Sequence, residues 1–222
     1  MNILYTCLLM YIIISFLEWY IHKYLMHRSD NQLINKVNHG FKQLYYKIHG
    51  SQQDEAHINH HQNVHNNGDV TVVDDDGMFY HWAHIPLTTV VGFAIYYAVT
   101  KSFGYTHKVK EYAIIFGCFG GISYLYYILW NILHPSYHRY GEYAKYEFIR
   151  NNSVYKYLEK YHMIHHLNKG DNKCNFNILL PGFDHLAGTF RWSVDNNEYC
   201  KGKIDKTDKD RELCNLEGKS VS

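Results

Sequence analysis

The sequence predicts an all-α membrane protein with about three transmembrane helices and a cytosolic helical cap that holds a histidine-rich dimetal site. Two observations predict this fold class: three long apolar stretches, and ten histidines in four short clusters. The chain has 222 residues, of which 46% are hydrophobic, so it has the size of one domain and is too apolar to be disordered. Its formal net charge of +1 gives no reason to expect a nucleic-acid partner.

The apolar stretches cover residues 3–20, 82–100 and 112–133. A helix needs about 20 mostly apolar residues to cross a bilayer, so the third stretch is long enough and the first two are just sufficient. The first stretch has no basic region before it and no small-residue cleavage pattern after it, so we predict a retained anchor and not a signal peptide. Buried core helices of a soluble protein are the alternative interpretation.

Tryptophans and basic residues predict the orientation in the membrane. Three crossings would bring Trp19, Trp82 and Trp130 to the same membrane face, and indole rings favour the membrane–water boundary. Lysine and arginine are more frequent on that face than in the loop between the second and third stretches, so the positive-inside tendency predicts that the face is cytosolic. We predict one multi-pass membrane domain over residues 1–200 and a polar, flexible tail over residues 201–222.

The four histidine clusters read HKYLMH, HINHH, HPSYH and HMIHH. An HxxHH pattern is expected by chance only about 0.1 times in a chain with this histidine content, so two copies are strong evidence of a site. Positions i, i+3 and i+4 lie on one face of a helix, so each HxxHH directs three rings into one volume. All four clusters are predicted to lie on the same membrane face. The candidate metal ligands are His22, His27, His57, His60, His61, His134, His138, His162, His165 and His166.

Two clusters depart from simple helical spacing. His22 and His27 are five residues apart, which places them about 140° apart on an ideal α-helix, so this pair needs an unwound helix end. His134 and His138 have the favourable i, i+4 spacing, but Pro135 between them is expected to kink or restart the helix. The seven remaining histidines fit no cluster, and we predict that they are structural or solvated.

About ten converging neutral imidazoles favour a borderline transition metal such as iron, zinc, copper or nickel. One ion uses four to six ligands, so ten histidines indicate two ions. The rings of such a site are normally oriented by hydrogen bonds from their second nitrogen atoms. The side chains that we consider for this role are Asp184, Asp171, Asn59 and Asn168.

The chain resembles the fatty acid hydroxylase/sterol desaturase superfamily in the order of its motifs: EWYIHKYLMH, HxxHH, NILHPxxH and HxxHH, followed by NKCNFNILLPGFDHLAGT. The resemblance covers roughly residues 15–192. The first cluster is also similar to that of the carotenoid hydroxylases. Many members have four spans, whereas we predict three.

The resemblance implies an integral membrane oxygenase, in eukaryotic cells usually of the endoplasmic reticulum, with its active site on the cytosolic side. It implies that the ten histidines hold two iron ions (zinc in some purified material), and that no other residue is catalytic. Such enzymes use O2 to hydroxylate a C–H bond of a membrane lipid: a fatty acyl, sphingolipid or sterol-like substrate. Their electrons come from an external donor such as a cytochrome b5-type carrier or a reductase, so we expect no bound haem or nucleotide.

Three other functions remain open at this point. A lipid or sterol desaturase would use the same site, and so would a carotenoid-type hydroxylase. A metal-binding membrane protein without catalysis is a different class, but it would be expected to carry ligands within its spans. The predicted clusters lie at or beyond the ends of the spans.

Overall fold

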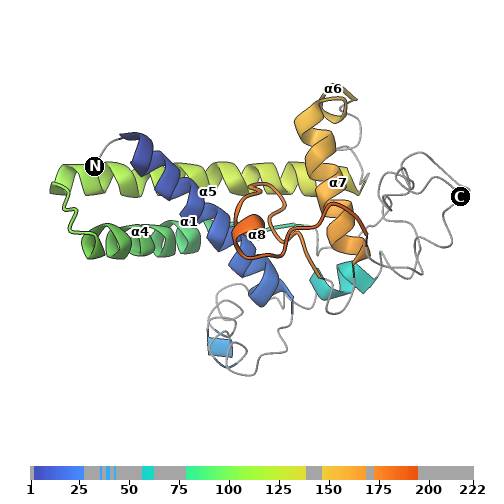
Figure 1. Cartoon of the computed structure of the whole chain (residues 1–222), viewed down its shortest axis with the longest axis horizontal. Helices are drawn as coiled ribbons and strands as arrows, with labels where there is room; N and C mark the ends of the chain where they lie inside the picture. The colour runs from blue at the N-terminus through green and yellow to red at the C-terminus, as the bar shows by residue number, and fades with distance from the viewer. Residues whose placement is uncertain are drawn as a thin grey trace, which may run out of the picture.

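The computed structural model describes residues 3–27, 57–62, 79–138, 147–168 and 173–194, together with single positions between residues 36 and 43. The described part is helical and contains no strand, which confirms the predicted all-α class (Figure 1). The predicted tail at residues 201–222 lies outside it. The elements are α1 (Ile3–Tyr20), the π-helix η1 (Ile21–Met26), α4 (His84–Ser102), α5 (Val109–Tyr137), α6 (Glu147–Arg150), α7 (Ser153–Leu167) and α8 (Phe183–Leu186).

Two helices of the described part are long and apolar enough to cross a membrane. They are the continuous helix Ile3–Met26, with 24 residues, and Val109–Tyr137, with 29 residues. The second predicted span corresponds to α4, which has 19 residues but is not among the helices that meet this criterion. The first and third predicted spans thus have the length and composition required, while the crossing by α4 stays a prediction.

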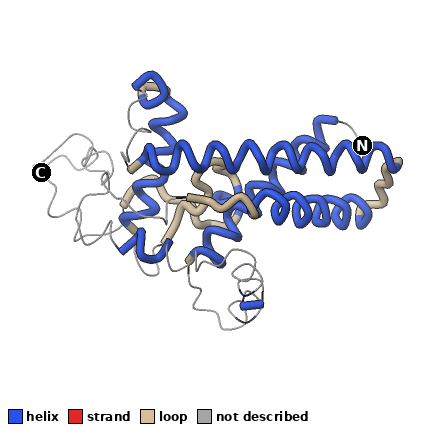
Figure 2. The backbone as a smooth tube through the Cα atoms, turned by 180° about the vertical axis from the view of Figure 1, so that it is seen from behind, coloured by secondary structure: helices blue, strands red, loops and turns tan. Residues whose placement is uncertain are grey.

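The long helices of the described part pack against one another. Helices α4 and α5 lie side by side as a hairpin, and α1 crosses them obliquely (Figure 1). The N-terminus and the α4–α5 turn lie at one end, while α7 lies toward the opposite end. Figure 2 shows the same arrangement from behind, with tan loop segments of the described part gathered beside α7. The clusters at the ends of α1 and α5 therefore lie on the same side as α7.

A small apolar core holds the three long helices together. Phe119 of α5 is fully buried and packs against α4 at Gly92, where there is no side chain to displace it. A Cβ atom at Gly92 would lie 2.9 Å from Cδ1 of Phe119 and 3.4 Å from Cδ1 of Leu17. Glycine at this position therefore permits the close approach of α4 to α1 and α5. The core comprises Met10, Ile13, Ile14, Leu17, Tyr96, Ile115 and Phe119.

We expect Gly92→Ala to destabilise the protein by about 1–3 kcal/mol, because the new methyl group would force the Phe119 ring to move within a packed core. Gly117→Ala is the matched control, since nothing lies within 4 Å of a Cβ atom at that helical position. The control should be neutral or stabilising by up to about 1 kcal/mol, as alanine favours helix more than glycine does. Thermal unfolding of the two detergent-purified variants measures the difference, and equal midpoints would contradict this account of Gly92.

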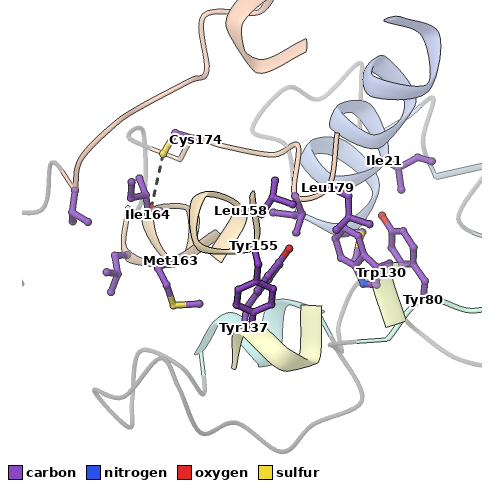
Figure 3. Close-up of a cluster of buried hydrophobic side chains, with 14 residues drawn as sticks. Ile21, Tyr80, Trp130, Tyr137, Tyr155, Leu158, Met163, Ile164, Cys174 and Leu179 are labelled. Carbon is purple, nitrogen blue, oxygen red and sulfur yellow. Dashed lines mark hydrogen bonds between the residues drawn. The ribbon is translucent and has the colours of Figure 1, made fainter. Parts of the chain in front are cut away.

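A second core positions α7 beside the end of α5 (Figure 3). Helix α7 begins at its N-cap Asn152, whose side-chain oxygen accepts a hydrogen bond from the Val154 amide at 2.8 Å. Its first turns are then fixed by Tyr155, whose ring packs against Tyr137 with the centroids 5.3 Å apart and whose hydroxyl lies 2.9 Å from the hydroxyl of Ser136. These contacts place the first turn of α7 next to the final turn of α5.

Helix α5 does not restart at Pro135. It continues through the proline to Tyr137, and His138 follows as its C-cap. The proline stands in the last turn, three residues before the C-cap, and lacks only its own N–H bond to the preceding turn. His134 and His138 therefore keep the i, i+4 relationship of a regular helix.

The buried carboxylate of Glu18, which the sequence does not predict to be important, holds the segment 173–194 against α1 by hydrogen bonds. Oε1 of Glu18 accepts hydrogen bonds from the Leu179 amide at 2.8 Å and from the Tyr126 hydroxyl at 3.1 Å. Oε2 accepts from the Leu180 amide at 3.0 Å and from Nδ2 of Asn177 at 3.1 Å. Four donors compensate the burial of this carboxylate, so Glu18 stabilises the path of the segment along the end of α1.

Candidate metal centre

The ten predicted histidines come together in two groups of five. In each group the candidate ligand nitrogen atoms all lie within 4.8 Å of one another, and nine of the ten residues are buried. Within the described part, neither group includes a carboxylate or a cysteine. We call the groups site A, formed by His22, His27, His57, His61 and His165, and site B, formed by His60, His134, His138, His162 and His166.

The two HxxHH motifs contribute to the sites in a reciprocal way. His57 and His61, at i and i+4 of the first motif, belong to site A, while His60 at i+3 belongs to site B. In the second motif the pair at i and i+4 belongs to site B, while His165 at i+3 belongs to site A. Each site thus receives two histidines from one motif and one from the other, so the prediction that each motif directs its three rings into one volume is wrong: the ring at i+3 joins the neighbouring site. Two copies of the motif are needed because each spans both sites.

The remaining two ligands of each site come from the end of a long helix. His22 and His27 complete site A from η1, and His134 and His138 complete site B from the last turn of α5. In η1 the amide of His27 donates to the carbonyl of His22 at 3.1 Å, an i→i+5 bond of the kind that defines a π-helix. The π turn therefore resolves the unfavourable spacing of this pair, and its ring centroids lie 5.0 Å apart.

Ring nitrogens converge in site A. The Nε2 atom of His165 lies 3.2 Å from Nε2 of His27 and 3.2 Å from Nε2 of His61. The Nε2 atoms of His22 and His57 are 3.1 Å apart. A neutral imidazole has one N–H and one lone pair, and each ring nitrogen directs only one of them outward. Nε2 of His165 cannot make a good hydrogen bond to two neighbours at once, whereas a central cation would accept lone pairs from all of these rings.

The same convergence occurs in site B. The Nε2 atom of His138 lies 2.8 Å from Nε2 of His162 and 3.2 Å from Nε2 of His60. The Nε2 atom of His166 lies 3.0 Å from that of His162. Five imidazoles that point toward one volume fit a borderline transition metal ion. Both buried groups could hold a metal ion.

Two backbone carbonyls determine the tautomer of two rings in site A. Nδ1 of His22 lies 2.8 Å from the carbonyl oxygen of Phe176, and Nδ1 of His165 lies 2.6 Å from that of Cys174. A carbonyl oxygen only accepts, so Nδ1 of each ring carries the proton and donates it. In the neutral ring Nε2 then presents a lone pair to the centre of site A, as a metal ligand requires.

Burial keeps the imidazoles neutral. Burial lowers the pKa of His27, His61, His162 and His166 well below the usual value for histidine, and repulsion between neighbouring imidazolium charges lowers it further. Only the neutral ring has a lone pair for a metal ion. These four rings, two from each site, are therefore in the protonation state that binds metal at neutral pH.

The two sites are immediate neighbours. The ring of His61 in site A stacks on the ring of His166 in site B, with the centroids 4.1 Å apart and the planes inclined by 23°. The motifs HINHH and HMIHH, a hundred residues apart in the sequence, thus lie against each other. The two groups of histidines therefore form one continuous cluster.

Asp184 supports site A indirectly. Its carboxylate is fully buried and accepts hydrogen bonds from the amides of Phe176, at 3.1 Å, and Asn177, at 2.7 Å. It also accepts from the hydroxyl of Tyr161 at 2.6 Å, and burial together with this carboxylate raises the pKa of Tyr161, which therefore stays a donor. Asp184 thus fixes the backbone segment whose carbonyl oxygens orient His22 and His165.

The other side chains considered for this orienting role have different places. Nδ2 of Asn168 donates to Sγ of Cys174 at 3.1 Å, and Asn59 is exposed. Asp171 lies outside the described residues. Sequence reasoning missed the carbonyls of Cys174 and Phe176, because a backbone acceptor has no residue signature. The only signal was the recognisable closing segment NKCNFN. Its presence suggests a defined backbone conformation but does not identify which backbone atoms accept the hydrogen bonds.

The described histidines outside the clusters do not join either site, in agreement with the sequence. His84 stacks on Tyr80 with a centroid distance of 4.3 Å. His107 lies near the α4–α5 turn, where Nε2 is 3.1 Å from the Tyr96 hydroxyl. His185 is exposed and stacks on Phe190.

No protein-family model matches the chain, and no curated protein or solved structure matches it. The histidine groups and the two apolar helices are compatible with the hydroxylase/desaturase superfamily. The likeness to that superfamily therefore depends on the order of the histidine motifs in the sequence.

Proposed function

We propose that the chain is a membrane-bound non-haem di-iron oxygenase of the fatty acid hydroxylase/sterol desaturase type, which hydroxylates a C–H bond of a membrane lipid. The observation that carries the proposal is the pair of adjacent five-histidine groups, in which each HxxHH motif contributes to both. A cluster that only stored metal would not require two neighbouring sites built from shared helices. One ion would be held by site A and one by site B.

Hydroxylation of an unactivated C–H bond needs an oxidant that side chains alone do not supply, and a pair of iron ions with O2 and two electrons supplies it. The protein's own contribution is to hold and orient the ligands. Neutral imidazoles leave more positive charge on the ions than carboxylates would. The carbonyls of Cys174 and Phe176 keep His165 and His22 in the binding tautomer, so little reorganisation is needed when the ions bind.

A small cavity between the long helices supports a proposal for the side from which the lipid would approach. It lies between α1, α4 and α5, and Leu17, Ser123 and Tyr80 are among its lining residues. Tyr80 stacks on Trp130 with the centroids 4.2 Å apart, and the Trp130 ring in turn lies 4.8 Å from the ring of His134. Trp130 therefore separates this mainly apolar cavity from site B. We propose that the hydrocarbon part of the substrate enters from this side and that its polar head stays near the membrane surface.

The remaining parts of the proposal follow from the resemblance and the charge pattern. The chain would cross the membrane about three times, with the histidine sites on the cytosolic side, in a eukaryotic cell in the endoplasmic reticulum. Electrons would come from an external carrier of the cytochrome b5 type or from a reductase. A desaturase would use the same ligands, and the two reactions differ in the product: hydroxylation adds one oxygen atom, whereas desaturation removes two hydrogen atoms.

The test combines metal analysis with lipid analysis. The full chain, purified in detergent, should contain about two iron ions for each protein molecule. Cells that express it under ¹⁸O2 should accumulate a lipid that carries one heavy oxygen atom and is absent from cells with an empty vector. A product two hydrogens lighter and without label would favour the desaturase. Metal-free protein and an unchanged lipid profile would contradict the proposal.

A further inference from the structure

The two sites differ in what supports their rings. In site A, the Nδ1 atoms of His22 and His165 donate to backbone carbonyls at 2.8 and 2.6 Å. In site B, the Nδ1 atoms of His162 and His166 are buried and have no hydrogen-bond partner among the described residues. These four rings are all buried, so the difference in supporting hydrogen bonds distinguishes two rings of site A from two rings of site B.

The carbonyls that support site A are themselves held firmly. The Asp184 carboxylate accepts from the amides of Phe176 and Asn177, and the Asp184 amide donates to Oδ1 of Asn177 at 2.9 Å. Asn175 lies between Cys174 and Phe176, whose carbonyl oxygens accept these bonds, and has a φ of 54°, a left-handed conformation that asparagine tolerates better than most residues. The Asn175 amide donates to the carbonyl of Thr189 at 3.0 Å. The acceptors for His22 and His165 are therefore part of a rigid buried network that extends to α1.

Such bonds affect metal affinity. A hydrogen bond from the second nitrogen of a ligating imidazole fixes its orientation and raises its basicity, and removing the partner typically lowers metal affinity by about 10–100-fold. We propose that site A and site B bind metal unequally: site A binds the first ion tightly, and site B binds the second ion more weakly. Asp184 is a positioning residue for site A. This inference rests on the metal-binding part of the proposed function.

Unequal affinity has a consequence for the enzyme. When metal is scarce, the protein holds one ion in site A and has no complete dimetal centre. Site B is then the site that limits assembly of the active form. Its ligands on α7 include His162 and His166, whose Nδ1 atoms have no hydrogen-bond partner among the described residues.

A metal titration tests the inference without measuring activity. Full-length protein in detergent is stripped of metal and titrated with Co²⁺, with calorimetry and the visible absorbance of the bound ion as readouts. We expect two steps whose affinities differ by at least about 10-fold. His165 and His166 are adjacent on α7 but belong to different sites, so their alanine variants are matched. His165→Ala should remove the tight step, and His166→Ala should remove the weak step and leave the tight one.

Asp184→Asn tests the supporting network separately. Its amide group cannot accept from both backbone N–H groups as the carboxylate does, so the tight step should weaken by about 10-fold while the weak step stays unchanged. Two equal steps in the wild-type protein, or loss of the tight step in His166→Ala, would overturn the inference and leave the dimetal proposal intact. A wild-type protein that binds no Co²⁺ would contradict the proposed function itself.

Discussion

His165→Ala is expected to abolish lipid turnover, lowering it by at least about 100-fold, while the protein still inserts into the membrane. The loss should exceed what the removal of a supporting hydrogen bond usually causes, because His165 is itself a ligand. Its Nε2 lies 3.2 Å from those of both His27 and His61, so it stands between two other ligands of site A. The His61→Ala variant should behave in the same way.

The matched control is His185→Ala. This histidine lies in α8, is exposed and is outside both groups. Labelled product is measured in cells that express each variant, and membrane fractionation shows whether the variants insert. If His165→Ala retained the turnover of the control, His165 would have to be removed from the ligand set.

Asp184→Ala is expected to lower the free energy of unfolding by about 3–5 kcal/mol. The substitution leaves the amides of Phe176 and Asn177 and the hydroxyl of Tyr161 without their acceptor in a fully buried place. Each buried donor left unsatisfied costs about 1–3 kcal/mol. Burying an unsatisfied polar group is one of the few mechanisms that produce effects of this size.

Thermal or denaturant unfolding of the metal-free, detergent-purified protein measures this effect apart from metal binding. His185→Ala again serves as the control, because it changes the neighbouring exposed residue and should alter stability by less than about 0.5 kcal/mol. If Asp184→Ala unfolded at the same midpoint as this control, the carboxylate could not be the main support of the segment 173–194.

The convergence of the ten histidines was predictable because it depends on local spacing and on chain direction. The spacing in HINHH and HMIHH determines which rings share a helix face, and the apolar stretches between the clusters determine which clusters meet. The assignment to two sites was not predictable. It depends on how the helical residues 57–62 pack against α7, and this is decided by tertiary packing and not by the local sequence.

The supporting groups were predictable only in part. Asp184 was considered because it is polar and lies in the closing segment, but it acts through the amides of Phe176 and Asn177 and not on a ring. Glu18 was overlooked because a single acidic residue near the end of an apolar stretch is typical of a span that reaches the membrane surface. Its four donors come from residues more than a hundred positions away, so no local sequence pattern predicts these hydrogen bonds.

The π-helical turn η1 at the end of α1 can be compared with the last turn of α5, because each carries a pair of histidine ligands. The pair in HKYLMH is separated by one residue more than the pair in HPSYH, yet the ring centroids are 5.0 Å apart in the first and 5.3 Å apart in the second. A wider turn absorbs the additional residue, so the ring centroids are similarly spaced at both helix ends, although the ring planes are inclined by 28° in the first pair and by 87° in the second. Shortening HKYLMH by one residue would convert its spacing to that of HPSYH, and an ordinary α-helical turn could then present the pair. The extra residue is thus a feature of how this chain reaches the geometry, and the geometry itself does not require it.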